Sequence, residues 1–154
     1  MNPAALRRLM ARFAPPITVK AVGFWRGGYG NDPRYPRPQH FVRRGWHAAE
    51  LKLILAYLRS GYPAAAYQGS STCRFRGCVE GKYNGSQEFT DTEWGWPQGL
   101  AHYVERHAVI LPEKFVNTMR ANNWQMPTLP KPLSNVHLDD TYWIKWATRS
   151  RPKR

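Results

Sequence analysis

The two cysteines of this chain and two of its five histidines follow a spacing that predicts a metal site. Cys73 and Cys78 enclose four residues, and His102 and His107, further along the chain, enclose another four. Two thiolates and two imidazoles are the ligand set of a closed tetrahedral zinc site. We therefore predict that Zn2+ bound by these four residues holds the centre of the chain together, as in a Cys2His2 finger with a long insert.

The histidine spacing also predicts where a helix ends. Residues five apart on an ideal helix differ by about 140° in direction, so both histidines reach one ion only where the helix tightens or frays. Leu111-Pro112, just beyond His107, indicates such an end. Two other interpretations remain open: free or disulfide-paired cysteines with unrelated histidines, and a catalytic zinc ion. Four protein ligands would leave a catalytic ion no position for water.

Size and composition favour one folded domain. The chain has 154 residues, of which 42% are apolar and 14% aromatic, enough to bury a core.

No apolar run is long enough to cross a bilayer, and the N-terminus lacks the apolar core of a signal peptide. We expect a cytoplasmic protein. The alternative is an organellar matrix protein, because residues 1–31 contain no acid and residues 3–14 could form an amphipathic presequence helix.

The pattern along the chain predicts the fold class α+β. Apolar periodicity and proline positions predict four helices, over 3–14, over 46–60, from Pro97 and from Pro112. A β-branched and aromatic run predicts a strand over 17–25, and alternation predicts a last strand over 141–148. We also expect strands over 64–72 and 88–96, with a hairpin turn at Asn84-Gly85. We expect a single small domain with a long amphipathic helix, a small antiparallel sheet and a finger-like ββα zinc module.

Three regions make up this unit. Residues 1–63 are a basic N-terminal helix, strand and helix region. Residues 64–126 are the finger-like zinc module. Residues 127–154 contain a Pro-rich linker, the last strand and a basic tail.

Residues 69–116 carry several short motifs. They are Gly-Ser-Ser-Thr-Cys-Arg from Gly69, Asn84-Gly85, Thr90-Asp91, Trp-Pro-Gln-Gly-Leu-Ala-His-Tyr-Val-Glu-Arg-His from Trp96, and Leu-Pro-Glu-Lys-Phe-Val from Leu111. About a third of the chain thereby resembles a group of small bacterial proteins of uncharacterised function with a Cys2His2 zinc-finger-like motif. The cysteines of that group are usually two residues apart, so Cys78 is displaced here. The resemblance supports the four metal ligands and implies no activity.

Charge is concentrated in the two flanks of the zinc module. The net charge is +13, of which residues 1–60 carry +9 and residues 111–154 carry +5, whereas residues 61–110 carry −1. A basic surface favours polyanionic partners. We predict phosphate contacts from nine basic residues: Arg7, Arg8, Arg12, Arg43, Arg44, Arg149, Arg151, Lys153 and Arg154. Three aromatic residues could stack on bases: Trp25, Tyr29 and Tyr35.

The function we expect is that of a non-enzymatic, zinc-stabilised basic protein that binds nucleic acid without sequence specificity through its flanks. The alternative is a subunit that docks on a protein assembly. A small hydrolase or nuclease is a further alternative, with Glu88, Asp91 and Glu93 as its carboxylates. His137 beside Asp139 and Asp140 could mark a second metal site, although surface or core roles are commoner for such residues.

Overall fold

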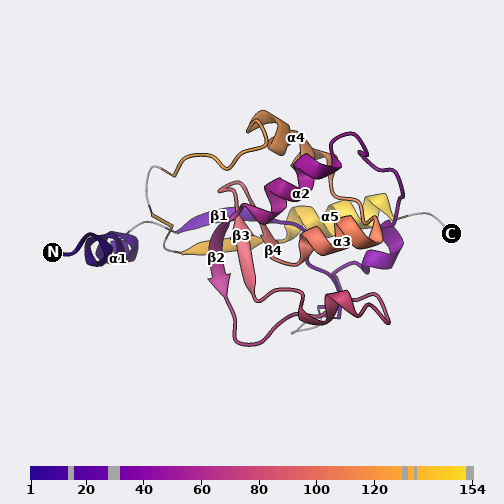
Figure 1. Ribbon diagram of the computed structural model, residues 1–154, viewed down its shortest axis with the longest axis horizontal. Coiled ribbons are helices and arrows are strands. Elements are labelled where there is room, and N and C mark those ends of the chain that lie inside the picture. Colours follow the sequence, from indigo (N-terminus) through magenta and orange to yellow (C-terminus); the bar gives the residue numbers. More distant parts are fainter. Residues whose placement is uncertain (14–15, 28–31, 130–131, 134, 152–154) are drawn as a thin grey trace.

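The computed structural model describes residues 1–13, 16–27, 32–129, 132–133 and 135–151. Within these residues the chain forms one α+β domain (Figure 1). Its elements, in order, are α1 (Pro3–Phe13), β1 (Ile17–Ala21), the 3-10 helix η1 (Pro38–Phe41), α2 (Leu51–Arg59), β2 (Tyr62–Ala66), the 3-10 helix η2 (Glu80–Tyr83), β3 (Gln87–Thr90), β4 (Trp94–Pro97), α3 (Leu100–His107), α4 (Glu113–Ala121), β5 (Val136–Asp139) and α5 (Thr141–Ser150).

The described strands form one mixed sheet in the order β2-β3-β4-β1-β5. Strands β2, β3 and β4 are antiparallel neighbours, whereas β1 runs parallel to both β4 and β5. The prediction of an antiparallel sheet is therefore wrong for the half of the sheet that contains β1 and β5. Because the strands come from all three predicted regions, the sheet joins those regions into a single domain.

Three tryptophans form the centre of the core. Trp94, Trp96 and Trp143 are fully buried, together with apolar side chains of α2, α3 and α4. A buried indole N–H needs an acceptor, because an unpaired polar group loses its hydrogen bonds to water. Each of the three finds one, at 2.8–3.0 Å: Thr118 Oγ1, the Leu58 carbonyl and the Phe24 carbonyl, respectively.

The predicted last strand over 141–148 is wrong, because these residues form α5. Trp143 and Ala147 are its buried positions, whereas Lys145, which a strand would place on the same face as both, is exposed. The Thr141 amide donates to Asp139 Oδ1 at 3.0 Å, which satisfies one amide of the first turn. The strand of this region is β5, four residues that pair with β1.

Two other elements are shorter than expected. The predicted helix 46–60 is nine residues long, because residues 44–50 form turns in which Gly45 and His47 have positive φ. The predicted strand 88–96 is interrupted after Thr90 by a turn in which Thr92 has φ 80°. This turn, and not Asn84-Gly85, joins the β3–β4 hairpin. The strands predicted over 17–25 and 64–72 are also shorter, at 17–21 and 62–66.

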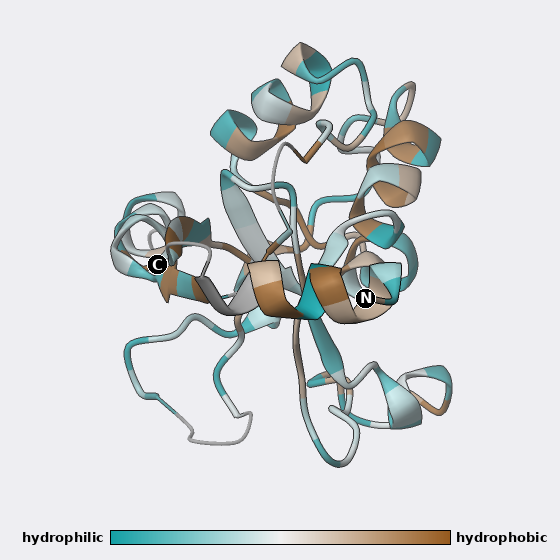
Figure 2. Cartoon of the chain, turned by 90° about the vertical axis from the view of Figure 1, so that its left-hand side faces the viewer, coloured by the Kyte–Doolittle hydropathy of each residue, from teal (hydrophilic) through white to brown (hydrophobic). Residues whose placement is uncertain are grey.

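Helix α1 lies at one end of the molecule, and α5 extends toward the opposite end (Figure 1). The apolar residues Leu6, Leu9 and Met10 of α1 are 40–55% exposed, and Figure 2 shows apolar and polar residues alternating along this helix. In the described part of the chain, no helix combines the length and apolar character needed to cross a membrane.

Candidate metal centre

The structure brings the four predicted ligands together. One ligand atom from each of Cys73, Cys78, His102 and His107 lies within 4.8 Å of the others. The His107 Nε2 atom is 3.3 Å from both sulfurs, and His102 Nε2 is 3.4 Å from the Cys78 sulfur. Tetrahedral zinc separates a sulfur from a nitrogen ligand by roughly 3.6 Å. The donor set and its spacing therefore suit a four-coordinate metal ion.

Helix α3 supplies both histidines, and its end explains their unusual spacing. His102 lies in its first turn and His107 is its last residue. The next residue, Ala108, adopts a left-handed conformation with φ 51°, which terminates the helix. The prediction that His107 lies at a helix end is confirmed. The Phe75 ring stacks on the His107 ring at a centroid distance of 4.0 Å and an angle of 4°, which fixes the orientation of the imidazole.

The cysteines lie in the long connection between β2 and β3, and not at the base of a β-hairpin. Backbone hydrogen bonds close this connection: the Cys73 amide donates to the Gly81 carbonyl at 2.8 Å, and the Asn84 amide donates to the Ser71 carbonyl at 2.7 Å. We call residues 67–86 the cysteine loop. It contacts α3 through an Arg106–Glu80 ion pair and a 2.9 Å hydrogen bond from the Arg74 amide to Tyr103 Oη.

Gly81 has no space for a side chain. A Cβ atom at this position would overlap Cys73 Cβ and would lie 2.9 Å from His102 Nε2 and 3.2 Å from the Cys78 sulfur. The backbone of the cysteine loop thus passes directly against three of the four ligands. This close approach is the reason that a glycine is required there.

Burial shifts the pKa of Cys73, His102 and His107. Burial lowers the pKa of both His102 and His107, and the neighbouring His102 and Arg106 lower that of His107 further. Burial raises the pKa of the Cys73 thiol, and the Cys78 sulfur adds to this effect. The imidazoles are therefore neutral near pH 7 and ready to bind, whereas Cys73 must lose a proton when a metal binds.

The alternative of a second metal site at His137, Asp139 and Asp140 has no support in the structure. Within the described ranges, the Cys2His2 group is the one set of three or more His, Cys, Asp or Glu side chains with metal-ligand geometry. Asp139 instead accepts a hydrogen bond from the Thr141 amide, and Asp140 accepts one from the Tyr35 hydroxyl at 3.0 Å.

The three carboxylates proposed for hydrolysis each have a different partner. Glu88 accepts from the Tyr67 hydroxyl at 2.6 Å, and Glu93 pairs with Lys20 at 3.4 Å. Asp91 is almost fully buried, and it accepts hydrogen bonds from the Tyr57 hydroxyl and from the amides of residues 93 and 94. Burial raises the pKa of Asp91. These contacts give Asp91 the role of holding the β3–β4 turn.

The predicted phosphate-binding residues are separated in space. Arg7 and Arg8 are exposed on α1 at one end, whereas Arg149 and Arg151 are exposed at the end of α5 near the other (Figure 1). Arg43 and Arg44 are exposed just after η1. The Arg12 side chain, Lys153 and Arg154 lie outside the described residues. Among the described residues, the arginines of α1 therefore lie apart from those at the end of α5.

The aromatic residues proposed to stack on bases do not form a set of exposed rings among the described residues. Trp25 is only 6% exposed and packs against Phe41, Tyr103 and Trp143, so this prediction is wrong. Tyr35 is half-buried, and its hydroxyl donates a hydrogen bond to Asp140. Burial and this hydrogen bond raise the pKa of Tyr35 to about 12. Tyr29 lies outside the described residues.

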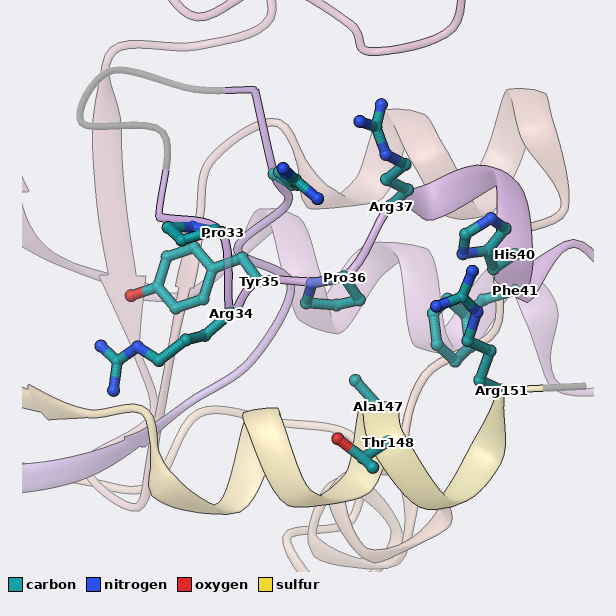
Figure 3. Close-up of a pocket in the computed structure, with 11 residues that line it drawn as sticks. Pro33, Arg34, Tyr35, Pro36, Arg37, His40, Phe41, Ala147, Thr148 and Arg151 are labelled. Carbon is teal, nitrogen blue, oxygen red and sulfur yellow. The ribbon is translucent and has the colours of Figure 1, made fainter.

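A basic pocket that the sequence analysis missed lies between η1 and α5 (Figure 3). Arg26, Arg34, Arg37, His40 and Arg151 line it, and no carboxylate does. We call it the arginine pocket. A signal for it is present in the sequence, because Pro33-Arg34-Tyr35-Pro36-Arg37-Pro38 alternates basic residues with rigid prolines. Arg151 also lines the pocket, but it lies more than a hundred residues further along the chain, and no local pattern in the sequence indicates this contribution.

Comparison with protein-family models, with curated proteins and with solved structures found no match to this chain. The class of protein is thus defined by the fold and the site alone: a single α+β domain with a Cys2His2 cluster that could hold a metal ion such as zinc.

Proposed function

We propose that this protein is a non-enzymatic, zinc-stabilised domain whose arginines bind the phosphate groups of nucleic acid. The zinc ion would be held by Cys73, Cys78, His102 and His107, and its role would be to fix the cysteine loop on α3. The spacing of the four donor atoms supports this assignment. A site closed by four protein ligands has no position for a reacting water, so its contribution is to stability and not to chemistry.

The observation that carries nucleic-acid binding is the gathering of arginines from two distant segments. Arg26, Arg34 and Arg37 come from the segment after β1, and Arg151 follows α5. Arg43 and Arg44 are exposed and follow shortly after η1. Arginine is well suited to phosphate, because its planar guanidinium donates two parallel hydrogen bonds to the phosphate oxygens. We call the surface formed by these residues and Arg149 the arginine face.

A salt titration tests the proposal. Each phosphate contact with a single strand contributes a slope of about −0.7 to the plot of log affinity against log salt concentration. Four contacts would weaken binding of a single-stranded oligonucleotide by roughly fifty-fold between 50 and 200 mM salt. Fluorescence anisotropy with a labelled oligonucleotide measures this. An affinity that does not change with salt, or no binding at 50 mM salt, contradicts the proposal.

Two matched double variants test where on the protein the nucleic acid binds. Arg43→Gln/Arg44→Gln removes two charges from the arginine face, whereas Arg7→Gln/Arg8→Gln removes two from α1 at the other end of the molecule. The first variant should bind several-fold more weakly with a shallower salt slope. The second should bind like the unaltered protein. The reverse result would move the interface to α1.

A protein-assembly role is supported by a different observation. Val79 and Tyr83, on the cysteine loop, are 85% and 77% exposed, and tyrosine is enriched at protein interfaces. Gel filtration of an extract, with and without nuclease, separates the two functions. Co-elution with a large species that survives nuclease and is lost in Val79→Asp/Tyr83→Ser supports docking by this loop.

A further inference from the structure

The arginine pocket holds more positive charge than the protein neutralises. Arg34 is paired with Asp32 at 2.7 Å and lies 3.8 Å from Asp140. The other three arginines of the pocket, Arg26, Arg37 and Arg151, have no carboxylate partner among the described residues. Three arginines without a carboxylate partner among the described residues thus line one small cavity, and their positive charge would attract an anion bound there.

The pocket is rigid before any ligand binds. Pro36 and Pro38 fix the backbone, and the Arg26 amide donates to the Pro36 carbonyl at 2.9 Å. The Tyr35 hydroxyl anchors the segment to Asp140, and the Phe41 ring stacks on Trp146 of α5 at 5.0 Å. Because the arginines are carried by a fixed backbone, less conformational entropy is lost when they bind an anion.

The size and shape of the pocket restrict the anion. Its volume is about 180 Å³, the space of only several water molecules. In Figure 3, Arg37, His40 and Arg151 lie at one end of the pocket, while Arg34 and the Tyr35 hydroxyl extend toward the other. The carbonyl end of α5 adds partial negative charge nearby, so the guanidinium groups, and not a helix dipole, must supply the attraction.

We propose that the arginine pocket binds a phosphate monoester, and specifically the terminal phosphate of a nucleic-acid strand. A terminal phosphate carries nearly two negative charges near pH 7, whereas an internal phosphodiester carries one, so it matches three unpaired arginines better. It also enters a small cavity end-on, whereas an internal phosphate must bring a strand through on both sides. The strand as the source of the phosphate rests on the function proposed above. A free phosphorylated compound would offer the same group.

The test compares two single-stranded DNA oligonucleotides of one sequence, with a 5′-phosphate or a 5′-hydroxyl group, together with a 3′-phosphorylated form. We expect at least one terminally phosphorylated form to bind about tenfold more tightly than the hydroxyl form. Arg37→Gln and Arg151→Gln should each reduce this preference to within about twofold. Lys52→Gln, which removes one charge from an exposed position of α2, should leave it unchanged.

The outcomes separate this inference from the proposed function. Equal binding of all oligonucleotides supports nucleic-acid binding and overturns the terminal-phosphate site. If no oligonucleotide binds but inorganic pyrophosphate does, detected by calorimetry and lost in Arg37→Gln, the pocket recognises the phosphate of a small compound and the nucleic-acid function is wrong. If neither oligonucleotides nor pyrophosphate bind, both proposals are overturned.

Discussion

Replacement of Gly81 by alanine should strongly weaken zinc binding, although no ligand residue is replaced. The added carbon would overlap Cys73 Cβ and would lie 2.9 Å from His102 Nε2. Ordinary contacts of a carbon atom begin near 3.4 Å, so the imidazole nitrogen must move by about 0.5 Å and Cys73 must move as well. Metal–ligand distances in a well-formed site vary by only about 0.2 Å. Both ligands therefore leave the range in which they can share one zinc ion.

The expected loss is large. Overpacking of this kind costs about 1–3 kcal/mol, and the strain falls on the zinc-bound state, in which the ligands cannot relax. We expect zinc affinity to fall about a hundredfold, which corresponds to about 2.7 kcal/mol. Competition with a chromophoric zinc chelator measures the affinity, and native mass spectrometry reports the number of zinc ions per chain.

Gly77→Asn is the matched control. Gly77 lies between the two cysteines and has φ 78°, but a Cβ atom there would meet nothing within 4 Å. Asparagine tolerates this left-handed conformation, so the variant should keep its zinc. The reasoning fails if Gly81→Ala remains folded and binds zinc as tightly as the unaltered protein, or if both variants lose zinc to the same extent.

Two further predictions concern stability. Free zinc at a hundred times its dissociation constant should stabilise the fold by about 2.7 kcal/mol relative to protein treated with a chelator. In thermal unfolding this corresponds to a rise in Tm of roughly 5–11 °C. Equal Tm values with and without chelator would exclude a stabilising metal. Asp91→Ala should lower the free energy of unfolding by about 2–4 kcal/mol, because it leaves the Tyr57 hydroxyl and two amides of the β3–β4 turn without their acceptor. Urea denaturation measures this loss. A change below about 0.5 kcal/mol would show that these hydrogen bonds do not stabilise the fold.

The ligand cluster could be predicted from the sequence because side-chain chemistry alone selects it. Cysteine and histidine at short spacings have few other reasons to occur together, and Leu111-Pro112 correctly indicated that α3 ends near His107. The position of the cysteines in a long connection could not be predicted in the same way. It depends on contacts with α3, such as the hydrogen bond from the Arg74 amide to Tyr103, which have no local signature.

The sheet shows the limit of local patterns more clearly. The pairing of β1 with β5 joins Ile17 to Val136, and nothing in either segment specifies a partner so distant in the chain. The alternating pattern of residues 141–148 favours a strand. In the fold, the helix buries Trp143 and Ala147 and keeps Lys145 exposed, whereas a strand would turn all three toward the core. Tertiary packing thus decides the structure where local propensity is weak.

The metal centre and the arginine pocket are connected by a direct contact. The Gln39 side chain lies in η1, between Arg37 and His40, and its Nε2 atom donates to the Arg74 carbonyl of the cysteine loop at 2.6 Å. Aromatic packing forms a second connection, from Phe75 through Tyr103 and Trp25 to Phe41.

If the cysteine loop holds η1 in place, removal of zinc should weaken the arginine pocket. We expect chelation to reduce the preference for a terminal phosphate several-fold, at a temperature where circular dichroism shows that the sheet remains folded. Gln39→Ala should cause a similar reduction while zinc stays bound, because it breaks the contact without disturbing the ligands. A preference that survives both treatments would show that the two sites share a fold but are energetically independent, since nearness alone does not establish coupling.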